Sequence, residues 1–188
     1  MDGLLLALIA CMAGEMGDRS QLLSHALAAR YRNTLWVAAG LAFAASANAA
    51  LSAYAGSLLG HLMSDDARHL FMALAFLTGG VTMWLPTRMP DKLSNWRLGA
   101  LGTSFFGLFI LGFGEGAQFL IAGIAVARGN PVLTAIGGAI GICVACLPAM
   151  LLGQEFFDHM PLRLLRRTAG GLFLIVGGTI AVQSLGLT

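Results

Sequence analysis

The sequence predicts an all-α, polytopic membrane protein, a transmembrane helical bundle of six to seven spans built from two inverted three-helix repeats. Three observations support this fold class. Of the 188 residues, 57% are hydrophobic and 11% are charged, whereas an ordinary soluble domain carries about 25% charged residues. The apolar residues gather into segments long enough to cross a bilayer. The two halves of the chain also match each other at a constant offset.

Six apolar segments follow one another with short connections, which leave no room for a soluble domain. A helix needs about 20 apolar residues to cross the hydrocarbon core of a bilayer. The first and fourth segments are longer and contain polar residues, so we expect these two helices to be broken or tilted. The expected spans are 3–29, 34–60, 67–86, 98–127, 131–154 and 164–186.

The clearest break between the halves lies at residues 86–92, where two prolines and several charges interrupt the apolar pattern. We expect a first three-helix repeat at 1–88, a cytoplasmic linker at 89–97 and a second repeat at 98–188. Each repeat has three spans, an odd number, so the second enters the membrane from the opposite side. Secondary transporters with this architecture hold their site near the midplane. A shift of 97 residues superposes Gly17 on Gly114, Gln21 on Gln118, Asn33 on Asn130, Gly40 on Gly137 and Gly56 on Gly153.

Basic residues are distributed unevenly between the two sides of this expected bundle. Cytoplasmic loops of membrane proteins are enriched in Lys and Arg. The side with eight basic residues should therefore be cytoplasmic, which places both termini outside, and we expect a bacterial inner (plasma) membrane location. The eight are Arg30, Arg32, Arg88, Lys92, Arg97, Arg163, Arg166 and Arg167, and the other side carries Arg68 and Arg128.

Composition and cysteine usage exclude several other classes. The net charge of +2 is too small to indicate a nucleic-acid partner, so the expected partner is the lipid bilayer, with a homo-oligomer left open. All three cysteines fall in apolar segments, which argues against a disulfide framework. Cys143 and Cys146 have the spacing of a thiol pair, but packing of small residues is the favoured interpretation. No enzyme is expected. An intramembrane aspartyl protease needs two aspartates that share a proton, and no Asp other than Asp18 lies within an expected span.

Residues 15–21, EMGDRSQ, place three charges inside the first apolar segment. A charge at the bilayer centre costs about 2.5–3.5 kcal/mol on insertion scales, so intramembrane charges indicate a functional site. A modified copy, GFGEGAQ, follows at residues 112–118. An internal salt bridge between Glu15 and Arg19 is the structural alternative. It leaves Asp18 unpaired, with Glu115 facing it from the other half.

The charges of the two motifs suit a divalent cation. Three acids and one arginine sum to −2, which such an ion neutralises. Carboxylate oxygens, helped by amide oxygens, are the ligands that hard ions such as Ca²⁺ or Mn²⁺ prefer. For Asn48 an interhelical hydrogen bond is favoured over a place in the ion shell. The candidate metal ligands are Glu15, Asp18, Glu115, Gln21 and Gln118, with Arg19 for charge balance and Ser20 and Asn48 as supporting residues.

Residues 15–20 resemble the motif of the GDT/TMEM family of Golgi and bacterial cation transporters, in the wider LysE superfamily. The hallmark of that family is two copies of Glu-x-Gly-Asp-(Lys/Arg)-(Thr/Ser), one in each half of a six- or seven-helix protein. Residues 15–20 match it at every specified position. The resemblance implies exchange of Ca²⁺ or Mn²⁺ for protons, often Mn²⁺ export in bacteria, with Glu15 and Asp18 as ion ligands. The transported ion is then a substrate, and no tightly bound cofactor is expected.

The second copy departs from that pattern. Gly112 stands where the family has Glu, Glu115 where it has Asp, and Gly116 and Ala117 replace the basic and hydroxyl residues. One acid and one base are lost together, so the net charge is unchanged, which favours a modified cation site. We therefore predict a secondary transporter that exchanges a divalent cation, Mn²⁺ ahead of Ca²⁺, for protons. The alternatives are an exporter of a small organic cation or amino acid, and a non-transporting membrane protein whose second motif has decayed.

Overall fold

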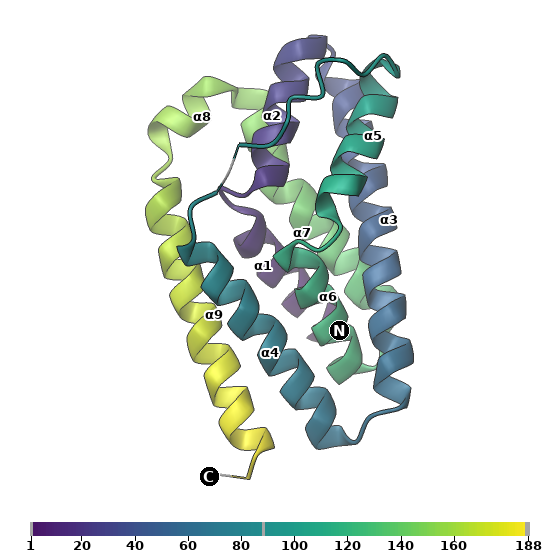
Figure 1. Cartoon of the computed structure of the whole chain (residues 1–188), viewed down its shortest axis with the longest axis vertical. Coiled ribbons are helices and arrows are strands. Elements are labelled where there is room, and N and C mark those ends of the chain that lie inside the picture. Colours follow the sequence, from purple (N-terminus) through teal and green to yellow (C-terminus); the bar gives the residue numbers. More distant parts are fainter. Residues whose placement is uncertain (1, 88, 187–188) are drawn as a thin grey trace.

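The computed structural model describes residues 2–87 and 89–186, which form helices and connecting loops without a strand (Figure 1). The predicted all-α class is confirmed. The described helices are α1 (Asp2–Glu15), α2 (Arg19–Tyr31), α3 (Thr34–His61), α4 (Asp65–Trp84), α5 (Gly99–Gly112), α6 (Gly116–Arg128), α7 (Pro131–Leu152), α8 (Gln154–His159) and α9 (Leu162–Ser184).

Helix bounds in the second half repeat those of the first at the offset of 97 residues. Helix α5 begins and ends 97 residues after α1, and α6 does the same relative to α2. Helices α3 and α7 also begin 97 residues apart, and so do α4 and α9. One difference is that α7 ends early, because Gly153 adopts φ +62° before the short helix α8. Its counterpart Gly56 lies within the uninterrupted helix α3.

The helices form a membrane bundle. Among the described residues, α3, α7 and α9 are each long and apolar enough to cross a bilayer. Helices α5 and α6 add a fourth span when they are taken together, with a bend of 67° between them. The first and fourth apolar segments are both broken at their polar motifs, as expected. Figure 1 places the two breaks near the middle of the long axis of the bundle.

Close approach between helices depends on small residues. Helix α1 packs on α7, α4 packs on α9, and α3 contacts α5, α6 and α7. A side-chain carbon at Gly137 or Gly141 of α7 would collide with the backbone of α1. Such glycines let membrane helices come close enough for dense packing, since lipid supplies no hydrophobic drive for association.

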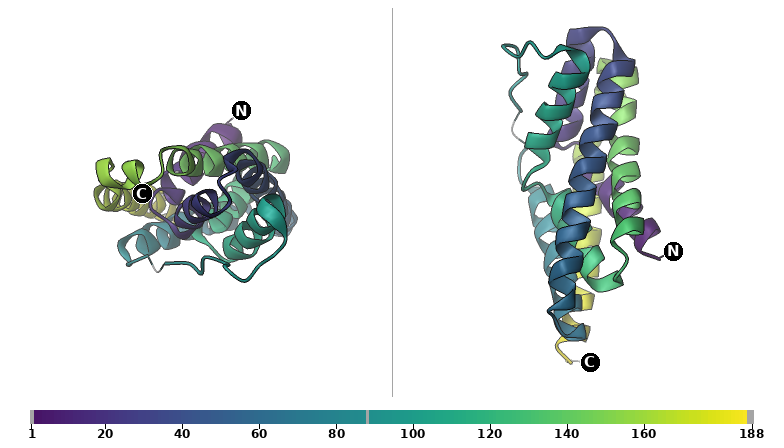
Figure 2. Two further views of the ribbon diagram at one scale, coloured as in Figure 1. Left: turned by 90° about the horizontal axis from the view of Figure 1, so that it is seen from above. Right: turned by 90° about the vertical axis from the view of Figure 1, so that its right-hand side faces the viewer.

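The ends of the bundle differ in what they carry (Figures 1 and 2). Helix α8 lies toward the upper end, and the connection that leads from α4 into α5 reaches that end, while α4 begins and α9 ends at the lower end. Arg30 holds this connection against α2 by donating to the backbone oxygens of Leu93, Ser94 and Trp96. Both breaks therefore lie between two ends that carry different segments.

Candidate functional site

The two motifs form two matching loops between broken helices. Gly17 has φ +70° and Gly114 has φ +80°, a backbone conformation that residues with a Cβ rarely adopt. One residue later, Asp18 and Glu115 have extended backbone and stand at the N-cap of α2 and α6. The glycine in each copy is therefore required by the turn, which places an acid at the start of the next helix.

The glutamines of the two motifs brace these loops in the same way. The Oε1 atom of Gln21 accepts a hydrogen bond from the Gly17 N–H at 2.9 Å, and the Oε1 atom of Gln118 accepts one from Gly114 at 3.2 Å. Gln21 is fully buried and also donates from Nε2 to the Ala145 oxygen at 2.6 Å. Both polar atoms of Gln21 are thus occupied. The structure does not bring this expected ligand to either of the cavities described next.

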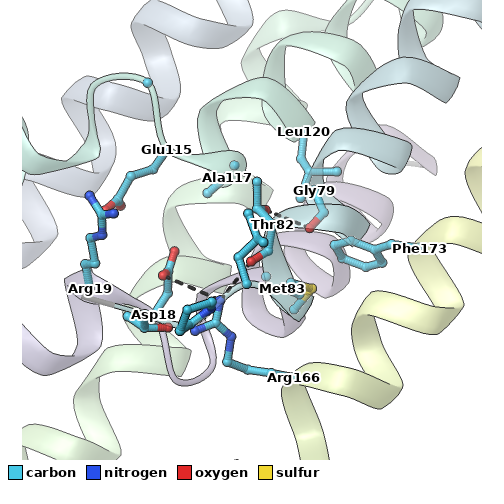
Figure 3. A pocket seen from close by; sticks show the side chains of 16 residues that line it. Asp18, Arg19, Gly79, Thr82, Met83, Glu115, Ala117, Leu120, Arg166 and Phe173 are labelled. Atoms are coloured by element: carbon cyan, nitrogen blue, oxygen red, sulfur yellow. Dashed lines mark hydrogen bonds and ion pairs between the residues drawn. The ribbon is translucent and has the colours of Figure 1, made fainter. Parts of the chain in front are cut away.

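The first cavity is a pocket of about 420 Å³ between the motif loops, α4 and α9 (Figure 3). Asp18 of the first motif and Glu115 of the second both line it, together with Arg19 and Arg166. The two acids at matching positions of the halves are therefore brought together, as the sequence predicted. We call this cavity the outer pocket.

The second cavity lies deeper, has a volume of about 20 Å³ and is lined by both motifs and α3. We call it the inner cavity. A volume of about 10–15 Å³ suffices for one water molecule, so a single small ion has room. Glu15, Glu115 and Asn48 line it, and each has a buried side-chain oxygen without a hydrogen-bond partner. Buried polar atoms in proteins are nearly always bonded, so three unpaired oxygens around one cavity make it a candidate binding site.

Contacts across the inner cavity join the two halves. Ser20 donates from Oγ to Oε2 of Glu115 at 2.8 Å, so the hydroxyl of the first motif holds the acid of the second. Asn48 donates from Nδ2 to the Phe109 oxygen on α5 at 3.2 Å, which is the expected interhelical bond. A side chain at Gly112 would collide with the Asn48 amide. Asn48 therefore occupies the space in which a second-copy glutamate would begin.

The ion pairs of the site do not include the salt bridge between Glu15 and Arg19 that was the structural alternative. In residues 2–87 and 89–186 the ion pairs are Arg68 with Asp65 and Arg166 with Asp18, so Glu15 has no arginine partner. Arg19 is exposed, and Figure 3 shows its side chain extending toward Glu115.

The acids are divided between the two cavities, with Glu115 common to both. Within residues 2–87 and 89–186, no three His, Cys, Asp or Glu side chains are close enough together to hold a metal ion.

Arg166 is the site residue that sequence reasoning missed. It was counted only among the basic loop residues, and the matching residue 97 positions earlier is the exposed His69. No sequence pattern marks it, because its place in the outer pocket depends on where α9 begins and how α9 packs on α4.

Acids at the breaks of two helices from matching halves of a membrane bundle are typical of secondary transporters. The model of the family described as "Divalent cation/proton antiporter GDT1" matches residues 3–91 and again residues 100–187. The chain belongs to this family of antiporters, which confirms the resemblance carried by residues 15–20.

A curated relative and the solved structures complete the comparison. The chain is 29% identical over 177 residues to a protein of Vibrio cholerae serotype O1 described as a "Putative manganese exporter". The match covers 94% of this chain and 88% of that protein. No solved structure matches the chain. The family assignment therefore rests on sequence along almost the whole chain.

Proposed function

We propose that this antiporter exports Mn²⁺ in exchange for protons, with Ca²⁺ as the second candidate cargo. The observation that carries the proposal is the inner cavity with its three unpartnered oxygens, which come from two carboxylates and one amide. Oxygen donors of this kind suit hard divalent cations. The name of the Vibrio cholerae relative supports Mn²⁺ as the cargo.

The ion-binding residues follow from the two cavities. Glu15, Glu115 and Asn48 are the ligands at the inner cavity, and Asp18 receives the ion in the outer pocket. Glu115 lines both cavities and passes the ion between them. Ser20 positions Glu115, and the exposed Arg19 balances charge at the mouth of the outer pocket.

The glutamines hold different places in this proposal. Gln118 lines the inner cavity and braces the second loop, whereas Gln21 braces the first loop and bonds the Ala145 oxygen of α7. The inner cavity has room for a bare ion and not for an organic cation or amino acid, so a cargo held there by Glu15, Glu115 and Asn48 is an ion. The three oxygens around it argue against a decayed, inactive second motif.

The two halves act as inverted repeats at 1–88 and 98–188, joined by a linker at 89–97. The repeated helix bounds and the double match of the family model support this division. Arg30 and Arg32 lie at the end of α2, and Lys92 and Arg97 lie in the connection that leads into α5, so the end of the bundle formed by these segments, the upper end of Figure 1, faces the cytoplasm and both termini lie outside a bacterial inner membrane. Arg88, another of the basic residues expected on this side, lies outside the described residues. Rocking of one repeat against the other then exposes the site to each side in turn.

Reconstitution in lipid vesicles tests the proposed exchange. An imposed pH gradient should drive Mn²⁺ across the membrane in wild type, and Asp18→Asn and Glu115→Gln should abolish this flux. Glu155→Gln removes an exposed acid on α8 and serves as the matched control, with flux equal to wild type. Absence of both Mn²⁺ and Ca²⁺ flux, with Asp18→Asn equal to wild type, would contradict the proposal.

A further inference from the structure

Arg166 ties the first motif loop to two other helices. Its Nη1 donates to the Gly17 oxygen at 3.1 Å, and its Nη2 donates to the Thr82 oxygen at the end of α4 at 3.2 Å. The same Nη2 lies 4.0 Å from Oδ1 of Asp18. Figure 3 shows the guanidinium between Asp18 and Thr82 inside the outer pocket. Only 12% of the Arg166 side chain is exposed, so it is a part of the pocket and no surface group.

The oxygens around this guanidinium are those that a metal cation would seek. Two backbone carbonyls and one carboxylate form a typical oxygen set for a hard divalent ion. A positive group fixed there neutralises Asp18 while no ion is bound. A cation that arrives at Asp18 is repelled by the guanidinium at close range. The ion and Arg166 therefore exclude each other from this position.

The second motif loop has no such cover. A side-chain carbon at Gly17 would come within 2.9 Å of Arg166, whereas a carbon at Gly114 would meet nothing within 4 Å. His69, the residue that matches Arg166 in the first half, is exposed on α4. The cover over the loop thus exists at one copy of the motif and is contributed by α9.

The bonds of Arg166 also cross the boundary that has to move. Arg166 belongs to the second half of the chain, and Gly17, Asp18 and Thr82 belong to the first. A rocking motion of one half against the other has to break contacts between them. The seated arginine therefore opposes that motion until something displaces it.

We propose that Arg166 takes the place of the cargo cation at Asp18 and so holds the empty transporter still. The inference rests on the proposed function. The consequence is that Mn²⁺ transport is coupled to proton transport, because a carrier that cannot return empty has to return loaded with protons. Arg166 is a positioning residue in this scheme, since it acts through Asp18 and the Gly17 loop.

The test measures Mn²⁺ and proton movement together in vesicles that carry an entrapped pH indicator. Wild type should move a fixed number of protons per Mn²⁺. R166Q should keep Mn²⁺ flux, move fewer protons per Mn²⁺ and reach half-saturation at a lower Mn²⁺ concentration, because the competing group is gone. R166K keeps the charge without the two-armed bond and should give an intermediate ratio. R167Q removes an exposed arginine one residue away and should match wild type in both readouts.

The outcomes separate the two proposals. Wild type that moves no Mn²⁺ defeats the proposed function, whereas coupled wild type with an unchanged ratio in R166Q overturns the role of Arg166 alone. Hydrogen exchange on wild type decides the case if R166Q fails to fold. Added Mn²⁺ should then speed amide exchange at the start of α9, where Arg166 is released, and unchanged or slower exchange there would also overturn the role.

Discussion

The two motif copies differ in composition far more than in backbone. Both loops have a glycine at positive φ, an acid at the N-cap and a glutamine that bonds the glycine N–H. Yet the first copy has two acids and a base, whereas the second has one acid and no base. The turn is thus the shared property of the two copies, and the charged groups on it can change while neighbouring helices compensate.

Asn48 is the compensating residue at the second copy. It stands beside Gly112, where the family pattern has a glutamate, and it contributes an unpartnered oxygen to the inner cavity. The acid Glu15 is present at the first copy, and the residue that matches Asn48 in the second half is Ala145. The first half therefore carries the larger residue at both positions, Glu15 and Asn48, and the second half carries the smaller, Gly112 and Ala145.

The largest expected effect is on Mn²⁺ binding and concerns Glu15, the acid whose position in the second copy is taken by Gly112. Glu15→Gln should weaken Mn²⁺ binding by about 100-fold or more, since even residues beyond the first ligand shell cost about 10–100-fold in metal affinity. Titration of Mn²⁺ uptake into vesicles measures the change. Glu155→Gln serves again as the control. A half-saturating concentration unchanged by Glu15→Gln would show that Asp18 and Glu115 bind the ion without it.

The close contact between Gly112 and Asn48 gives the next largest expected effect, which is on stability. Gly112→Ala should lower the free energy of unfolding by about 1–3 kcal/mol, the usual cost of an overpacked core. Asn48→Ala in the same chain should restore much of this loss, because it removes the colliding amide. Thermal unfolding in detergent measures the cycle. Gly178→Ala, on an open face of α9, is the control and should not lower stability, because alanine favours the helix and the added carbon meets nothing within 4 Å.

If the losses of unfolding free energy from Gly112→Ala and Asn48→Ala simply add in the double variant, the strain arises from a contact other than the one between positions 112 and 48. The further variant Gly112→Glu with Asn48→Ala recreates the second-copy acid of the family pattern. We expect it to transport Mn²⁺, since the added carboxylate takes the position of the lost amide oxygen.

The smallest effect distinguishes the two turn glycines. Alanine at either Gly17 or Gly114 should cost about 1–2 kcal/mol for the left-handed backbone. Gly17→Ala should cost more than Gly114→Ala, because a carbon there meets Arg166 while the space at Gly114 is open. Comparison of the two unfolding midpoints tests the order. Equal losses would show that Arg166 moves aside freely.

Local features of the sequence predicted much of the architecture. The spacing of apolar residues predicted a helical membrane bundle, and the charged motifs predicted breaks in the first and fourth segments. Those signals are local, since a positive-φ glycine and a run of charges interrupt a helix wherever it packs. The meeting of Asp18 and Glu115 in one pocket was also predicted, because the constant offset related the two motifs.

The roles of other site residues could not be read in this way. Gln21 was expected at the ion and instead bonds Gly17 and Ala145. Arg166 was expected only in a loop and instead fills the outer pocket. Ala145 lies 124 residues from Gln21, and Gly17 lies 149 residues from Arg166, so no local pattern reports these two contacts.

The sequence by itself determined the membrane-embedded class, the two breaks and the acids that flank them, because hydropathy, glycine geometry and charge act within a few residues. Only the tertiary structure decided which oxygens surround the inner cavity, that Asn48 stands beside Gly112, and that an arginine of α9 covers the first loop and not the second. Those facts depend on how closely distant helices approach, which is set by side-chain volumes on both partners at once.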